Sequence, residues 1–423
     1  MNLTRQPPRR PTNLGIAGIV GAARMTDKAR AANEETLGDY IYGETSGLDQ
    51  RVLAFLGISA DEFAEAVKEH DDDAALSNWV LETSGKTAAE IAAFNEERLT
   101  HMPDTDGHKQ RLQQRIARFA PGRTDIKTLL QSMELDDWGS FWQADLEARP
   151  PRSARAKDVG SICGVARMAD KARAERAGKI GDYLFGEVSG QDVRILTFLG
   201  ITADNFQEAA VNNPNNLELG EWVLENSGKS AAEIDAFNHT LVNYAPNDET
   251  RERFESRCRE VGVSPAEITT WVALQDVDDE RSFGIVDLER HAPRSPLNTD
   301  ICGIVHVARM VDKGRAVNSD SLGLYYYGED SRMDRIALEF LGLTPDAFAA
   351  ALKTLPTDAD VNAWLRENYP KDPADIAAHN ERLLQAGPRS EREWAFVKKM
   401  LGHTDATTWF EFAVIDDEKT FAI

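Results

Sequence analysis

A short motif of arginine, aspartate and lysine recurs three times in the chain and is the strongest candidate for chemistry. In the first copy its charged residues are Arg24, Asp27, Lys28 and Arg30. On a helix, Arg24, Asp27 and Lys28 fall within about 100° of one another, and Met25 lies on the opposite, apolar side. Guanidinium and ammonium groups on one face can bind a carboxylate or phosphate, so the motif predicts an anion site. The equivalent charged residues are Arg167, Asp170, Lys171 and Arg173 in the second copy, and Arg309, Asp312, Lys313 and Arg315 in the third.

Two other interpretations of this motif stay open. A solvated helix face with an Asp27–Arg30 pair would also place these charges together. Such a face should drift between copies, as residues 68–78 have drifted against 211–221, whereas the four charged positions keep their residue types. A buried salt-bridge network would also keep them, because removing one partner leaves an uncompensated buried charge.

A second repeated set follows the motif and contains Tyr40, Glu44 and Asp49. Gly38 and Gly43 border this stretch, which predicts a fixed turn. Asp49 is expected to cap the next helix. No helix signature explains Glu44, which is therefore a candidate acid, base or cation ligand. The equivalents are Tyr183, Glu187 and Asp192 in the second copy, and Tyr325, Glu329 and Asp334 in the third.

Other site chemistry has little support in the sequence. The eight histidines share no repeat position, and the three cysteines form no CxxC pair, so neither a repeated metal site nor a disulfide framework is predicted. The chain also lacks the P-loop, GxGxxG, GxSxG and HExxH patterns. We therefore expect no cofactor and no metal.

The charge balance restricts the possible partners. With 48 Lys and Arg against 71 Asp and Glu, the net charge is −23 and the pI is about 4.8. Nucleic-acid and anionic-membrane binders need a basic surface, so neither partner is expected. The apolar segment 14–23 follows several arginines and imitates an export signal, but it recurs at 159–166 and 301–308. We interpret these segments as helix starts and expect a cytoplasmic protein.

The repeat extends well beyond the motifs, with offsets of 143 and then 142 residues. It predicts three tandem domains of about 140 residues, at 1–149, 150–291 and 292–423. Helix-capping patterns begin at Ser59, Thr87, Ser230 and Ser264, which favours a mainly α fold in which each domain has one short extended segment, such as 39–42. The proline- and arginine-rich stretches 148–157 and 290–298 are expected to be exposed linkers.

The order of these motifs resembles a bacterial family, the domain of unknown function number 5069. The resemblance rests on Pro-Arg-Ser, then Arg-Met-x-Asp-Lys-x-Arg-Ala, Gly-x-Tyr-x-Tyr-Gly-Glu and Phe-Leu-Gly, and it covers nearly the whole chain as three copies. It implies a small soluble domain and supplies no activity. The chain departs from the pattern at Arg10, Phe185 and Gly314, which stand where the family pattern has serine, tyrosine and alanine.

Two functions are compatible with these residues. The first is a multivalent binding protein, in which each copy binds a small anionic ligand or a protein partner around Arg24, Lys28, Tyr40 and Glu44. The alternative is an enzyme acting on a small anionic metabolite, with Lys28 or Glu44 as proton carrier and the arginines as an electrostatic clamp.

Overall fold

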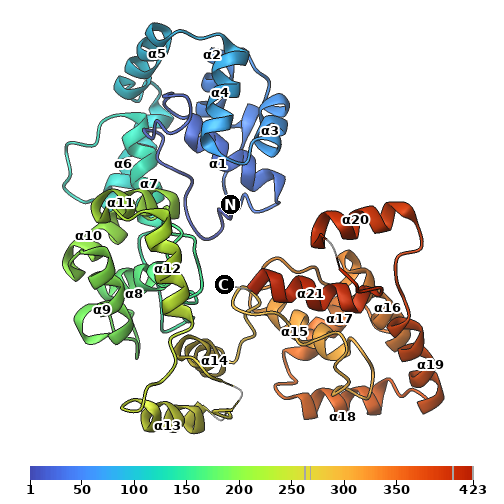
Figure 1. The fold of residues 1–423 in the computed structure, drawn as a ribbon. Helices are drawn as coiled ribbons and strands as arrows, with labels where there is room; N and C mark the ends of the chain where they lie inside the picture. Colours follow the sequence, from blue (N-terminus) through green and yellow to red (C-terminus); the bar gives the residue numbers. More distant parts are fainter. Residues whose placement is uncertain (262, 267, 403, 422–423) are drawn as a thin grey trace. The chain divides into compact units, whose positions relative to one another are not determined.

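The computed structural model describes residues 1–261, 263–266, 268–402 and 404–421. These residues form short α-helices joined by loops, and no strand occurs among them (Figure 1). The prediction of a mainly α fold is therefore confirmed. Within the same ranges, no helix has the length and apolar character needed to cross a bilayer.

Each copy of the repeat supplies seven α-helices and one turn of 3₁₀-helix. The first copy contains α1 (Ala22–Asn33), η1 (Gly43–Thr45), α2 (Gly47–Leu56), α3 (Ala60–Glu69), α4 (Asp73–Ser84), α5 (Ala88–Thr100), α6 (Asp106–Phe119) and α7 (Leu129–Phe141). The second contains α8 (Val165–Ala177), η2 (Gly186–Val188), α9 (Gly190–Leu199), α10 (Ala203–Asn212), α11 (Asn216–Ser227), α12 (Ala231–Val242), α13 (Arg251–Val261) and α14 (Trp271–Phe283). The third contains α15 (Val307–Asn318), η3 (Gly328–Asp330), α16 (Arg332–Leu341), α17 (Pro345–Leu352), α18 (Asp358–Asn368), α19 (Pro373–Leu384), α20 (Glu391–Leu401) and α21 (Trp409–Phe421).

The helices group into two compact units. One comprises Met1–Arg152 with Ala156–Phe237, and the other comprises Ser153–Arg155 with Asn238–Ile423. The border between them therefore falls within the second copy, in α12. Division of the chain into three independent domains at residues 149 and 291 stays a prediction.

The first helix of every copy is buried on nearly all sides. In α1 the alanines Ala22, Ala23 and Ala29 are inaccessible to solvent, and their small side chains let α3 pack closely against α1. Met25 joins Phe63 in the same apolar core. The corresponding helices pack in the same way, α8 against α10 and α15 against α17. Since the charged side of this helix is buried too, its charges must find partners inside the protein.

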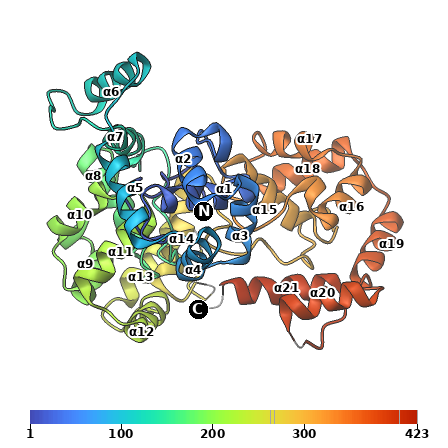
Figure 2. The same cartoon turned by 90° about the horizontal axis from the view of Figure 1, so that it is seen from above.

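The last two helices of every copy pack against each other. Helix α6 packs against α7, α13 against α14 and α20 against α21, and the last pair is drawn in red in Figure 2. Helices α7 and α21 are part of the candidate site, because each contains an aspartate that binds the motif arginine of the first helix in its own copy.

Local sequence signals set most of the helix starts. Ser59 and Thr87 form the predicted capping boxes with Glu62 and Glu90, and Ser230 makes the same hydrogen bonds with Glu233. The fourth predicted box includes Glu267, which lies outside the described residues, and the residues before it, 265–266, lie in a turn.

Two expectations about the segments before the first helix need correction. The first helices begin inside the predicted apolar segments, at Ala22, Val165 and Val307, but the residues before them, 14–21, 159–164 and 301–306, lie mostly in turns. Their apolar residues are nevertheless core residues, since Ile16 and Ile19 are fully buried. The proline- and arginine-rich stretches are not simply exposed linkers either, because Arg152 and Arg294 pair with aspartates of the first helix.

Candidate functional site

The lysine of the repeated motif lies at the centre of a buried cluster. Lys28 Nζ donates to Asp49 Oδ1 at 2.7 Å, to Ser46 Oγ at 3.0 Å and to the carbonyl oxygen of Ile41 at 3.0 Å. The other carboxylate oxygen of Asp49 accepts from the Gly43 amide at 3.0 Å. Lys28 is 3% exposed and Asp49 is inaccessible. We call this arrangement of lysine, aspartate, serine and loop carbonyl the clamp.

The clamp is repeated in the other two copies. Lys171 Nζ donates to Asp192 Oδ1 at 2.7 Å and to the Leu184 carbonyl at 2.9 Å, and Lys313 Nζ donates to the Tyr326 carbonyl at 3.0 Å and to Asp334. The serines are Ser189 and Ser331, and the glycine amides that bind the aspartates are those of Gly186 and Gly328.

These contacts use the whole donor capacity of the first lysine. An ammonium group has three N–H donors, and those of Lys28 go to a carboxylate, a hydroxyl and a carbonyl within the protein. Burial lowers the pKa of Lys28, against the opposing effect of Asp49. This geometry matches the buried-network interpretation of the motif, since no donor of Lys28 is directed at solvent.

The clamp fixes a short loop that contains an apolar residue exposed to solvent. In the first copy the loop is 38–43, bordered by Gly38 and Gly43 with φ of 61° and 69°. A Cβ on Gly43 would lie 2.9 Å from Cβ of Ala60, so the close approach of α3 also requires glycine. Ile41, whose carbonyl Lys28 binds, is 54% exposed. We call 38–43, 181–186 and 323–328 the clamped loops.

The arginine of the motif forms a second buried group. The Arg24 guanidinium binds both carboxylate oxygens of Asp137 in α7, at 2.5 and 3.3 Å, and lies over the Tyr40 ring. The Tyr40 hydroxyl donates to Asp137 Oδ1 at 2.8 Å. Burial raises the pKa of Tyr40, and the Asp137 charge adds to the effect. Tyrosine, arginine and aspartate thus hold α7 against α1.

The third copy repeats this group closely. Arg309 binds Asp417 of α21 at 2.6 and 2.9 Å, and the Tyr325 hydroxyl donates to the same carboxylate at 2.8 Å. In the second copy, Arg167 lies over the Tyr183 ring and donates to the Arg152 carbonyl at 3.1 Å.

The motif aspartate pairs with an arginine that was not among the predicted site residues. Asp27 accepts from the Arg9 backbone amide at 2.8 Å and from its Nη2 at 2.9 Å, and both side chains are buried. Burial alone would lower the pKa of Arg9, but Asp27 outweighs it and the pKa is raised. The equivalent pairs are Arg152–Asp170 at 2.8 Å and Arg294–Asp312 at 2.7 Å. The repeated Pro-Arg at the start of each copy was the signal for them.

The last arginine of the motif binds the start of the fourth helix or the residues before it. Arg30 donates to Asp73 at 3.0 Å, and Arg315 donates to Asp358 at the same distance. Arg173 instead donates to the carbonyls of Ala210 and Asn213, both at 2.9 Å.

The repeated glutamates lie outside the buried network, and the N-cap of α2 is not the residue expected from the sequence. Glu44, Glu187 and Glu329 are exposed, on the side of the loop that faces solvent, so they do not converge with the buried arginines and lysines. The prediction that Asp49 caps α2 was wrong, because Ser46 is the N-cap residue and Asp49 lies within the first turn. The ion pair with Lys28 explains why an aspartate recurs at this position in every copy.

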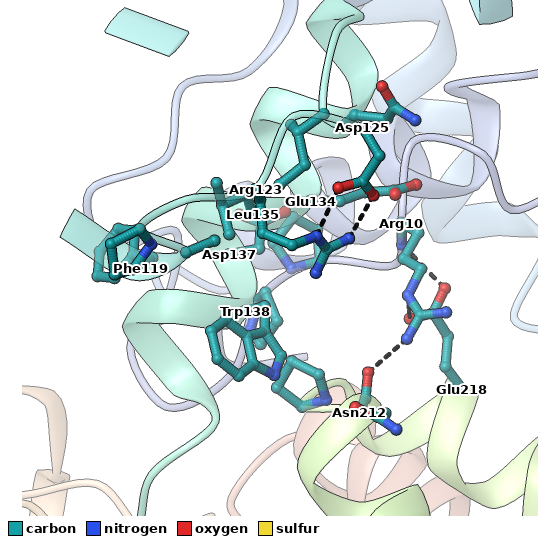
Figure 3. Close-up of a pocket in the computed structure, with 17 residues that line it drawn as sticks. Arg10, Phe119, Arg123, Asp125, Glu134, Leu135, Asp137, Trp138, Asn212 and Glu218 are labelled. Atoms are coloured by element: carbon teal, nitrogen blue, oxygen red, sulfur yellow. Dashed lines mark hydrogen bonds and ion pairs between the residues drawn. The ribbon is translucent and has the colours of Figure 1, made fainter. Parts of the chain in front are cut away.

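A cavity of about 610 Å³ lies beside this network in the first unit (Figure 3). Phe119 and Trp138 contribute aromatic surface, and the Arg10 and Arg123 guanidiniums point into it. Both arginines already have partners, since Arg123 binds Asp125 at 2.5 Å and Arg10 donates to Asn213. None of the candidate residues from the sequence lines the cavity, and its walls combine parts of two copies, so it is not one of three equivalent sites.

The comparisons agree with the repeat. The model of the domain of unknown function 5069 matches residues 5–138, 148–281 and 290–419. The chain belongs to this family and contains three tandem copies of its domain. No curated protein matches the chain. In the part that the structure describes, no group of three or more His, Cys, Asp or Glu side chains is arranged to hold a metal ion.

Proposed function

We propose that the protein is a multivalent module for a protein partner, and that the contact in each clamped loop is the exposed apolar residue whose backbone carbonyl binds the buried lysine. Ile41, Leu184 and Tyr326 occupy equivalent positions and are 54%, 58% and 70% exposed. In each copy the backbone carbonyl of this residue accepts a hydrogen bond from the buried lysine. The proposal rests on this observation, that the same residue in every copy has an exposed side chain and a backbone carbonyl held by the buried lysine.

A single exposed apolar residue would not indicate a binding site. Scattered exposed apolar side chains are normal on protein surfaces. Here, however, a large apolar side chain recurs at the same loop position in three copies, although its identity changes from isoleucine to leucine to tyrosine. Holding the backbone in advance lowers the entropy cost of binding. A fixed apolar side chain is therefore well suited to enter a pocket on another protein.

The charges around the loops indicate the chemistry of the partner. Exposed Asp39 and Glu44 flank Ile41, and exposed Asp182 and Glu187 flank Leu184. With a net charge of −23 on the whole chain, these carboxylates favour a partner whose apolar pocket has a rim of lysine or arginine. The exposed glutamates would thus serve association rate and specificity rather than catalysis.

A small anionic ligand and an enzyme have less support. The buried lysine has all its donors engaged in the first copy, and the buried arginines bind aspartates or carbonyls. Glu44 is exposed and lies apart from them, which leaves no convergent acid–base set. We place this binding protein in the cytoplasm, in keeping with its three free cysteines, two of them buried.

Replacing the three loop residues with serine should abolish partner capture without unfolding the protein. Ile41→Ser, Leu184→Ser and Tyr326→Ser remove exposed side chains, so each should change the free energy of unfolding by no more than about 0.5 kcal/mol. Because linked sites reinforce each other, each added substitution should weaken binding by about tenfold or more. The measurement is quantitative mass spectrometry of proteins retained by each variant, followed by affinity measurement on the purified partner.

The matched control is a pair of leucines that are exposed at another equivalent position. Leu81 in α4 and Leu224 in α11 are about one-third exposed, and Leu81→Ser/Leu224→Ser should leave capture unchanged. Equal loss in this control, or full retention by the triple loop variant, would exclude the clamped loops as the contact.

A further inference from the structure

The third copy differs from the other two at the start of its first helix. Gly21 and Gly164 precede α1 and α8 with φ of 85° and 82°, and the equivalent residue before α15 is His306, with φ of 71°. A non-glycine residue with such a φ is strained, and strain of this kind concentrates at functional sites. The histidine is also buried, at 3% exposure.

His306 binds the aspartate of the clamp. Its Nε2 lies 2.7 Å from Asp334 Oδ1, the same oxygen that accepts from Lys313. The Asp334 carboxylate is thus shared by the histidine, the lysine and the Gly328 amide. In the other two copies glycine replaces the histidine, so their aspartates have no such partner at that position.

We propose that His306 makes the clamp of the third copy acid-sensitive, because this histidine takes up a proton when the clamp opens, so that acid favours an open form in which His306 has left Asp334 and the loop carrying Tyr326 is loosened. In the neutral ring, Nε2–H donates to Asp334 and Nδ1 carries a lone pair. Nδ1 is buried and has no hydrogen-bond partner among the described residues. Protonation would create a second N–H with no acceptor and a cation beside Lys313 and Arg309.

The charged surroundings oppose a proton on the folded form. Burial lowers the pKa of His306, and the Lys313 and Arg309 charges add to this effect, whereas Asp334 opposes it. Phe410 of α21 stacks on the ring at 5.7 Å and offers no acceptor. The groups that interact with His306 itself are Arg309 and Lys313 on α15, Asp334 on α16 and His379 on α19. Asp417 on α21 and the loop residues Tyr325 and Tyr327 interact in turn with these groups or with one another.

A second buried histidine of this copy acts in the same direction. His379 stacks on Phe340 at 4.0 Å, where the other copies pair Phe94 with Phe55 and Phe237 with Phe198. Both nitrogens of His379 are buried and have no hydrogen-bond partner in the part of the chain that the structure describes, and burial lowers the pKa of His379 to about 4.

The sign of the pH effect follows from these environments. A histidine whose pKa is lower in the closed form binds more protons when the loop opens, so closure weakens as the pH falls below the ordinary histidine pKa of about 6.5. If the closed form stays unprotonated, opening becomes about tenfold more favourable between pH 7.5 and pH 5.5. The consequence for partner binding depends on the proposed function, whereas the release itself does not.

Hydrogen exchange at the glycine amides that bind the three aspartates tests the release on the whole protein. After correction for intrinsic exchange rates, protection of the Gly328 amide should fall about tenfold more between pH 7.5 and pH 5.5 than protection of Gly43 and Gly186. His306→Gly gives this copy the residue of the other two and should remove the difference. His306→Asn, which tolerates positive φ and does not titrate, serves if the glycine variant fails to fold.

The hydrogen-exchange experiment can support or overturn the proposal without a binding partner. Equal pH dependence of all three amides, or a Gly328 response that persists in both His306 variants, would overturn the proposal. His379→Phe should retain the Gly328 response, because His306 is still present. If exchange of the Gly328 amide shows the expected pH dependence but Tyr326→Ser still captures the partner fully, the acid-sensitive release is supported and the proposed function is rejected.

Discussion

Lys28→Met is expected to lower the free energy of unfolding by about 3 to 5 kcal/mol, because it leaves Asp49 as an unpaired carboxylate in the core. Asp49 is inaccessible to water and would keep only the Gly43 amide as donor. The Ile41 carbonyl and the Ser46 hydroxyl would lose their donor as well. Denaturant unfolding followed by circular dichroism, together with calorimetric melting, measures the loss.

Two control variants separate burial from charge alone. Lys68 lies on the surface and pairs with exposed Glu65, so Lys68→Met should cost no more than about 0.5 kcal/mol. Lys28→Met/Asp49→Asn removes both charges while the asparagine oxygen can still accept from Gly43, so it should recover most of the loss. A loss below about 1 kcal/mol in Lys28→Met would mean that the lysine is hydrated, and the anion-pocket interpretation would regain support.

Arg9→Met should cost a similar amount, about 3 to 5 kcal/mol, because Arg9 and Asp27 are both buried. The guanidinium donates to both oxygens of Asp27 and also reaches Asp73. After the substitution Asp27 would retain only the backbone amide of residue 9. The same unfolding experiments apply.

The third copy provides a graded comparison for this pair. The Arg294 side chain is 26% exposed and Asp312 is 11% exposed, so water can partly solvate the aspartate after Arg294→Met. We expect a smaller loss there, roughly 1 to 3 kcal/mol. Equal losses at Arg9 and Arg294 would indicate that burial does not set the energy of these pairs.

The sequence was sufficient to predict the repeat and the helical class. Residue types at Arg24, Asp27, Lys28 and Arg30 persist across copies, and each has a partner inside the protein that explains its persistence. Capping boxes at Ser59 and Thr87 are local patterns, so a single sequence reveals them. The identity of the motif residues indicated constraint, but it did not distinguish a buried network from a ligand site.

The partners of these residues could not be predicted, because they depend on packing between distant segments. Asp137 lies 113 residues after Arg24, and they meet only because α7 returns to α1. Arg9 is 18 residues before Asp27, and the equivalent stretches of the other copies, within 148–157 and 290–298, were interpreted as linkers because proline interrupts helices. The repeated positions of these residues were visible in the sequence, but their proximity was not.

The exposed loop residue was also missed, for a different reason. Ile41, Leu184 and Tyr326 differ in type, so no motif marks them. Alternation of polar and apolar residues over 39–42 was interpreted as strand-like, whereas the loop is fixed by the clamp and by two glycines with positive φ. Glu44 was selected because it repeats, and its exposure becomes evident only from the folded loop.

The central claim is that the buried lysine holds the clamped loop, and hydrogen exchange at the glycine amides tests it most directly in Lys28→Met, Lys171→Met and Lys313→Met. Each substitution should speed exchange at one amide only, Gly43, Gly186 or Gly328 respectively, by about tenfold or more, since about 1.4 kcal/mol of lost closure already gives that factor. Unchanged exchange at all three amides in folded variants would contradict the claim, because the loops would then keep their conformation without the lysines.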